Sequence, residues 1–375
     1  MSAQVEPIRA IAISRLAHEL QAAGRSVIHL ELGQPSTGAP RAAIQAAHQV
    51  LDTSALGYWE SPALTARIAR HYAETYGAAV DPEQVVLTCG ASPALLLAMI
   101  SRFAPGDRVA LARPGYVAYR NTLKALRMVP VELDCGAACG YRLTAAAIEA
   151  LDPPPAGVII ASPANPTGTI IAAAELEAIV AVCRRRNIQI ISDEIYHGWS
   201  YTEPAHSIVE FEPDALVVNS FSKYYCMTGW RLGWLLAPLS VVERVRGYAG
   251  NLFLTAPTPS QHAALVAMDS RDELDANVET YRRNRALLLQ ALPTLGLDAI
   301  APPDGAFYIY ADVQHLTDDS LGFCTRLLHD TGVALAPGVD FDPVEGSHFI
   351  RMSFAASTPD VVEALARLRP WFTGR

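Results

Sequence analysis

The chain has 375 residues, of which 51% are hydrophobic and 18% are charged, and its formal net charge is −9. This length suffices for a large core and for two domains, and the acidic charge argues against nucleic acid as a partner. No apolar run approaches the roughly 18 residues of a membrane helix, and the N-terminal residues are amphipathic, unlike a secretory signal. We therefore expect a globular, soluble protein without a membrane partner.

The six cysteines give no sign of a metal site. None forms a C-x-x-C pair, and Cys135 and Cys139 have no histidine nearby in the sequence. Free thiols are kept reduced in the cytoplasm. We expect a cytoplasmic protein that binds no metal.

The first 80 residues have mainly helical spacing. Between the first two helical segments, a short strand over residues 27–32 runs into the turn Gly33-Gln34-Pro35. Gly24 ends the first helix, as glycine commonly does. The predicted helices are 8–23, 40–51 and 64–76.

From Val85 onwards, short apolar strands alternate with helices, which is typical of a doubly wound parallel sheet. Ala91 and Ser92 follow the first of these strands and open a helix, where free backbone N–H groups and the helix dipole favour an anion. The predicted strands are 85–88, 107–112, 128–133, 158–160, 188–192 and 215–218, and the predicted helices are 93–103, 119–127, 144–151 and 175–186.

Two of these strands end in polar residues that suggest chemistry. Asp193 and Glu194 follow the buried strand 188–192, and carboxylates are rarely buried without a partner. Asn165 opens an N-P-x-G element after strand 158–160, and its amide group can both donate and accept hydrogen bonds. A surface acidic cluster and a common Asn-Pro turn are the alternatives when each element is taken alone.

Lysine is rare in this chain, which makes Lys223 conspicuous. Of the 29 basic residues only Lys124 and Lys223 are lysine. Lys124 lies in an amphipathic segment and reads as a solvated charge, whereas Lys223 follows a buried strand among Ser220, Ser222 and Arg231, which form a plausible phosphate cradle. An amine can lose its proton and attack a carbonyl, which a guanidinium cannot do. The pattern indicates a phosphorylated carbonyl cofactor held as a Schiff base.

The last hundred residues predict a smaller domain. Arg351 lies in its alternating apolar strand 349–354, where a charge is costly unless it is paired. A long helix at 278–292 leads into this domain. Its other predicted elements are strands in 303–310 and 335–338 and a closing helix at 361–368.

The stretch Ser220–Gly233 reads S-x-S-K-x-x-x-M-T-G-W-R-x-G and resembles the lysine signature of the class I/II aminotransferases, the pyridoxal-phosphate enzymes of fold type I. Cys226 departs from the pattern, since the family generally has a small residue there. The resemblance implies an α/β fold with a large doubly wound, mostly parallel sheet domain and a smaller α+β domain built from both termini. We expect the small domain to comprise residues 1–40 and 278–375, and the large cofactor domain residues 41–277.

The resemblance also implies how pyridoxal 5'-phosphate would be held. Lys223 would carry it as a Schiff base, and Asp193 would keep the pyridine nitrogen protonated. Tyr196 and Asn165 would face the phenolic oxygen, and Tyr116 would stack on the ring. The phosphate would meet Ala91, Ser92, Ser220, Ser222 and Arg231, with Tyr58 reaching it from the neighbouring subunit of a homodimer.

The implied reaction moves an amino group between an L-amino acid and a 2-oxo acid in ping-pong order. Gly33, Asn165 and Arg351 would bind the substrate, with Arg351 on its carboxylate. The sequence does not select the substrate side chain, and candidates for its pocket are Tyr58, Trp59, Tyr116, His197, Trp199 and Tyr308.

Two other functions compete with this one. Similar residues support carbon–sulfur β-lyase and other fold type I chemistry, because the cofactor performs the hard step. A non-enzymatic, aminotransferase-like regulator is a more remote alternative. The acidic charge and the short stretch before Val27 argue against a DNA-binding module.

Overall fold

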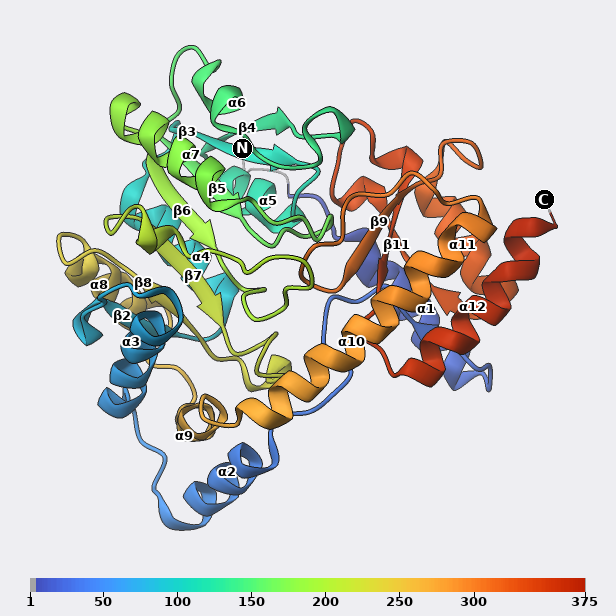
Figure 1. The fold of residues 1–375 in the computed structure, drawn as a ribbon. Helices are drawn as coiled ribbons and strands as arrows, with labels where there is room; N and C mark the ends of the chain where they lie inside the picture. The colour runs from blue at the N-terminus through green and yellow to red at the C-terminus, as the bar shows by residue number, and fades with distance from the viewer. Residues whose placement is uncertain (1–4, 375) are drawn as a thin grey trace.

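A seven-stranded sheet organises the larger part of the molecule (Figure 1). The computed structural model describes residues 5–374. The strand order is β2-β8-β7-β6-β5-β3-β4, in which β8 runs antiparallel to both neighbours and the other pairings are parallel. This confirms the predicted, mostly parallel sheet. The strands are β2 (Val85–Thr88), β3 (Arg108–Arg113), β4 (Val129–Asp134), β5 (Gly157–Ala161), β6 (Gln189–Asp193), β7 (Leu216–Ser220) and β8 (Gly233–Leu236).

Helices cover both faces of this sheet, which explains its continuous apolar strands. In β5, Val158 and Ile160 belong to one buried cluster and Ile159 to the other, because successive side chains of a strand point to opposite faces. One face packs on α4 (Ala91–Arg102), α5 (Val117–Ala125) and α8 (Val242–Leu252). The other packs on α2 (Arg41–Thr53), α3 (Pro62–Tyr76), α6 (Ala145–Glu149), α7 (Ala173–Arg186) and α9 (Thr258–Ala267).

A smaller sheet system joins the two ends of the chain. Ile28 pairs with Val333 in the parallel ladder of β1 (Ile28–His29) and β10 (Val333–Ala334). Beside it, β12 (Phe349–Ser353) pairs antiparallel with β9 (Tyr308–Asp312) and β11 (Ala336–Pro337). Figure 1 shows α1 (Arg9–Ala22) among the orange and red elements α10 (Arg271–Ala291), α11 (Ser320–Thr331) and α12 (Thr358–Thr373). Residues 1–4 of the predicted segment 1–40 lie outside the described residues.

Several boundaries differ from the predicted ones. The helix α10 begins at Arg271, earlier than the predicted residue 278, and its first turn carries Asp272 and Glu273, which suit a helix start. The sequence pattern did not predict β8, α8, α9 or α11. Glycines inside α8 and α11 lower their intrinsic helix propensity, so that tertiary packing decides their conformation.

None of the helices in residues 5–374 is both long and apolar enough to span a membrane. Asp193 ends β6, and the carboxyl ends of β5 and β7 lead into the loops that carry Asn165 and Lys223. Parallel strands present such ends at one edge of a sheet, where ligands usually bind.

Candidate active site

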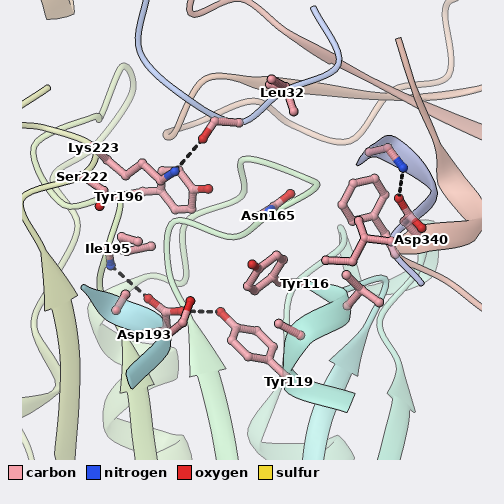
Figure 2. Close-up of a pocket in the computed structure, with 18 of the residues that line it drawn as sticks. Leu32, Tyr116, Tyr119, Asn165, Asp193, Ile195, Tyr196, Ser222, Lys223 and Asp340 are labelled. Carbon is pink, nitrogen blue, oxygen red and sulfur yellow. Dashed lines mark hydrogen bonds between the residues drawn. The ribbon is translucent and has the colours of Figure 1, made fainter. Parts of the chain in front are cut away.

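A cavity of about 320 Å³ lies where these strand ends meet the smaller sheet system. Its volume is in the range of small-molecule sites. Figure 2 shows Lys223, Tyr196, Asn165, Tyr116 and Asp193 around it. The predicted residues that line the cavity are Gly33, Ala91, Ser92, Tyr116, Asn165, Asp193, Tyr196, Ser222, Lys223, Arg231, Tyr308 and Arg351.

Five predicted residues do not line this cavity, namely Ser220, Tyr58 and the pocket candidates Trp59, His197 and Trp199. Ser220 is the last residue of β7 and is buried behind Ser222, whose backbone N–H donates to the Ser220 Oγ at 2.9 Å. Tyr58 lies in the connection between α2 and α3 with 82% of its surface exposed. Within one subunit Tyr58 therefore contributes nothing to the cavity.

Lys223 presents its amine to the cavity from the turn that follows β7. The turn closes when Cys226 N donates to the Lys223 carbonyl at 2.9 Å. The Lys223 Nζ donates to the backbone carbonyl of Gly33 at 2.5 Å. Burial lowers the pKa of Lys223 to about 8; the nearby Arg351 and Arg231 lower it too, and Asp193 opposes them. At a given pH the neutral fraction of this amine is therefore larger than that of a lysine side chain in water.

Asp193 ends β6 with both carboxylate oxygens occupied. Its Oδ1 accepts from Ile195 N at 3.1 Å and its Oδ2 accepts from the phenol of Tyr119 at 2.6 Å. Burial raises the pKa of Asp193, while these two hydrogen bonds and the charge of Lys223 lower it. Tyr119 was not among the residues predicted for the site. Its signal is the spacing Tyr116-x-x-Tyr119, since Tyr116 immediately precedes α5 and the two ring centres lie 5.4 Å apart at the start of that helix.

Arg351 is only 4% exposed and is held on several sides. Its Nη1 donates to Asn165 Oδ1 at 2.8 Å, and its Nη2 donates to the backbone carbonyl of Glu31 at 2.6 Å. The guanidinium carbon lies 4.4 Å from the ring centre of Tyr308 and 4.7 Å from that of Phe341. Its Nε is buried and has no hydrogen-bond partner among residues 5–374. An orphaned cationic N–H beside a cavity fits a carboxylate ligand.

The backbone of Gly33 closes the cavity beside two phenols. The hydroxyls of Tyr196 and Tyr308 are hydrogen-bonded at 2.7 Å. A Cβ added at Gly33 would lie 2.1 Å from the hydroxyl oxygen of Tyr308. Only glycine therefore fits at this position.

Another part of the cavity wall has the features of an anion site. Ala91 and Ser92 form the first turn of α4, so their backbone N–H groups are free and lie at the positive end of the helix dipole. Gly90 precedes them with φ of +98°, and a Cβ there would lie 2.6 Å from Arg231 Nη2. Arg231 itself is exposed and fixed by Thr228, whose carbonyl accepts from its Nη1 at 2.9 Å.

Taken together, these groups fit pyridoxal phosphate. They provide an amine with a lowered pKa, a buried carboxylate, aromatic rings, an anion site and an unpaired arginine N–H. Comparison with known proteins decides the family. The model of the family described as aminotransferase class I and II matches residues 25–368.

The chain belongs to the class I and II aminotransferases. It is therefore an enzyme that depends on pyridoxal phosphate and transfers an amino group between an amino acid and a 2-oxo acid. This result confirms the family, the cofactor and the reaction class expected from the Lys223 motif.

Proteins named as aminotransferases resemble this chain over nearly its full length. A valine–pyruvate aminotransferase of Mycobacterium tuberculosis is 45% identical, covering 99% of this chain and 97% of that relative. The crystal structure of an aminotransferase from the same organism has a TM-score of 0.97 at 44% identity, covering 100% of this chain and 99% of the other. An aspartate aminotransferase of Thermus thermophilus, solved with maleate, has a TM-score of 0.92 at 29% identity, covering 97% of each chain. These structures confirm the type I fold.

Some lining residues had no sequence signal that pointed to the site. They include Glu31 and Phe341. Glu31 is fully buried, accepts from His29 Nδ1 at 2.8 Å through Oε1, and has no partner for Oε2 among the described residues. The first turn of α1 and Asp340 complete the wall.

Proposed function

We propose that Lys223 binds the cofactor covalently, as a Schiff base between its Nζ and the cofactor's aldehyde carbon. The observation that carries this proposal is the meeting of Lys223, Asp193 and Arg351 in one cavity. The lowered pKa of Lys223 supports it, because only a neutral amine attacks a carbonyl.

When bound, pyridoxal phosphate supplies an electron sink for the charge that develops at the Cα of the amino donor. Asp193 would face the pyridine nitrogen, Tyr116 would cover the ring, and Tyr196 with Asn165 would face the phenolic oxygen. Ala91, Ser92, Ser222 and Arg231 would hold the phosphate, while Ser220 would act indirectly by accepting from the backbone N–H of Ser222.

The protein residues then handle the substrate and one proton. Arg351 and Asn165 would bind the carboxylate of the donor, beside the backbone of Gly33. Once the incoming donor has freed it, the amine of Lys223 would take the proton from the donor Cα and deliver it to the former aldehyde carbon of the cofactor, as a general base and then a general acid. The amino donor and the 2-oxo acid acceptor would use the same site in turn, so that we expect ping-pong kinetics.

We further propose an apolar aliphatic donor such as valine, with pyruvate as the acceptor. The name of the relative that is 45% identical supports this choice. Within the described chain, the basic residues lining the cavity are Lys223, Arg231 and Arg351, each with a role above, which leaves no cation for a second carboxylate. The apolar residues of the walls include Ile8, Ile11, Leu32, Val117 and Phe341.

We also propose a cytoplasmic homodimer. Tyr58 is exposed and outside its own cavity, which suits a residue that reaches the partner's phosphate site. The six free cysteines suit a reducing compartment. For the domains we keep the division into 1–40 with 278–375 and 41–277, which the pairing of β1 with β10 supports.

A lysine exchange with a matched control tests the function. Purified Lys223→Ala should lose the visible absorbance of the bound cofactor and all transamination. Lys124→Ala removes the other lysine, which lies on α5 and does not line the cavity, and should leave both unchanged. Normal turnover in Lys223→Ala would refute the assignment.

A donor panel tests the substrate. Valine, alanine, aspartate and cystathionine would each be offered with pyruvate or 2-oxoglutarate. We expect turnover with valine and pyruvate and none with aspartate. Release of pyruvate from cystathionine without an acceptor would instead favour a carbon–sulfur lyase.

Subunit mixing tests the role of Tyr58. If Tyr58 serves the partner's site, a hybrid of Lys223→Ala and Tyr58→Ala subunits contains one intact site. Mixing the two weakened variants should therefore restore activity. Light scattering of the mixture should give the mass of a dimer. No recovery on mixing would exclude a role across the interface.

A further inference from the structure

The first turn of α1 lines the cavity but is not capped by its own sequence. Ile8 occupies the position before the helix and offers no side-chain acceptor, and the first turn carries no acidic residue. Backbone N–H groups at a helix start need acceptors, and a missing cap costs stability.

Asp340 supplies these acceptors from a distant part of the chain. Its two carboxylate oxygens accept from Arg9 N and Ala10 N, each at 2.7 Å, and Figure 2 shows this link between Asp340 and the helix backbone. Asp340 is only 3% exposed and lines the same cavity as Arg351. Both hydrogen bonds are charge-assisted and aligned with the helix dipole.

A second anchor holds the residues just before the helix. The side-chain amide of Asn121, on α5, donates to the backbone carbonyl of Glu6 at 3.0 Å. Ile8 therefore lies between two fixed points, Glu6 and Arg9. The chain that carries it has little freedom to move away from the cavity.

This anchored turn extends an apolar part of the cavity wall that lies next to Arg351. Phe341 lies against the Arg351 guanidinium and packs in one cluster with Ala10 and Ile8. Ile11 follows on the same turn, lines the cavity and is 52% exposed. A donor whose carboxylate is held by Arg351 would have this surface within reach of its side chain.

We propose that Asp340 is a positioning residue for donor specificity. It holds Ile8 and Ile11 against the cavity, so that both contact the apolar side chain of the donor. This inference rests on the proposed function, because the donor must first be bound through Arg351. In this proposal Asp340 acts through the backbone of α1 and not by contact with the donor or the cofactor.

The test compares two buried aspartates of the same loop in the holoenzyme. Asp340→Asn places an amide nitrogen against one helix N–H, and it should raise the KM for valine about tenfold while changing that for alanine less than about twofold. Asp342→Asn is the matched control: Asp342 is 4% exposed, pairs with Arg113, and does not line the cavity. It should leave the valine-to-alanine ratio of kcat/KM unchanged.

Two further measurements separate this role from a general loss of stability. Hydrogen–deuterium exchange of the α1 amides should become faster in Asp340→Asn and not in Asp342→Asn. Ile11→Ala, a change at an exposed side chain, should reproduce the loss of valine selectivity. The double variant with Asp340→Asn should lose no more than either single variant, because both act on the same contact.

An equal decrease in kcat/KM for valine and alanine in Asp340→Asn would overturn the proposal. Unchanged exchange in α1 would also overturn it. A wild-type enzyme that accepts no apolar donor would refute the proposed donor class instead, and the exchange experiment would still decide whether Asp340 holds α1.

Discussion

The phenol of Tyr119 donates a 2.6 Å hydrogen bond to Oδ2 of Asp193, the carboxylate that we assign to the pyridine nitrogen. Both groups are buried, so this bond lies in a low-dielectric environment. If the bond were lost, water would not take its place. Burial raises the pKa of Asp193 and the Tyr119 bond lowers it. Tyr119 therefore helps to keep the carboxylate charged.

We expect Tyr119→Phe to weaken cofactor binding. Loss of a hydrogen bond to a charged group costs about 1.5–3 kcal/mol, which corresponds to a Kd for pyridoxal phosphate that is higher by roughly 10- to 150-fold. Fluorescence titration of the apoenzyme with pyridoxal phosphate would measure this Kd. Tyr201→Phe is a suitable control because it also loses a phenol bond, to the Ala306 carbonyl at 2.7 Å, away from the cavity. Equal Kd values in both variants would contradict a role for Tyr119.

The lowered pKa of Lys223 predicts how cofactor capture depends on pH. With a pKa of about 8, the rate at which apoenzyme takes up pyridoxal phosphate should rise with pH and level off above that value. Stopped-flow absorbance would give the midpoint. Arg351→Gln removes a neighbouring positive charge and should move the midpoint upwards. A midpoint near that of an ordinary lysine in the wild type would show that the site does not favour the neutral amine.

Gly33 offers a steric test of the cavity. A methyl group there would meet the Tyr308 hydroxyl at 2.1 Å, so Gly33→Ala should displace groups around Lys223 and lower kcat/KM by about 100-fold. Gly38→Ala is the control, since an added Cβ there meets nothing within 4 Å. Adding Tyr308→Phe to Gly33→Ala removes the clashing oxygen and should restore part of the activity. If the added Tyr308→Phe restored no activity, the clash with the Tyr308 hydroxyl would not be the cause of the loss in Gly33→Ala.

The pair of His29 and Glu31 predicts a pH dependence of stability. The hydrogen bond to Glu31 raises the pKa of His29 in the folded protein, although partial burial opposes it. A histidine whose pKa is raised on folding stabilises the folded protein fully at pH values below its pKa in the unfolded chain, near 6.5. This stabilisation is lost as the pH rises through the pKa of the histidine in the folded protein.

The difference in melting temperature between wild type and His29→Gln isolates this effect. We expect the melting temperature of the wild type to exceed that of His29→Gln by more at pH 6 than at pH 8.5. Other histidines, such as the buried His197, whose pKa burial lowers to about 3, contribute equally to both proteins and cancel. A difference that does not vary with pH would contradict the prediction.

The parts of the site that could be predicted are those that follow strands. Asn165 and Lys223 follow apolar runs and Asp193 ends one, and the ends of parallel strands meet at one edge of a sheet. Arg351 was predicted because a charge in an apolar strand needs a partner. Local pattern singles out such residues, and the resemblance carried by the Lys223 motif supplies their expected roles.

Residues whose role depends on long-range pairing could not be predicted in this way. Asp340 bonds to Ala10 across 330 positions of sequence, and Tyr119 to Asp193 across 74. The spacing from Tyr116 places Tyr119 near the site, but no neighbouring residue of Tyr119 or Asp340 indicates the distant group to which it bonds. Ser220 was included for its position in the motif, yet its side chain lies behind the cavity and supports Ser222.

The bond between Arg351 and the Glu31 carbonyl has a consequence for biosynthesis, because its two residues are 320 positions apart. On the ribosome, all seven strands of the large sheet have been made once residue 236 has emerged. The amine of Lys223 then still lacks the arginine that would hold a substrate. Catalytic competence thus arrives with the last strand to be translated, and a nascent chain cannot begin amino transfer early.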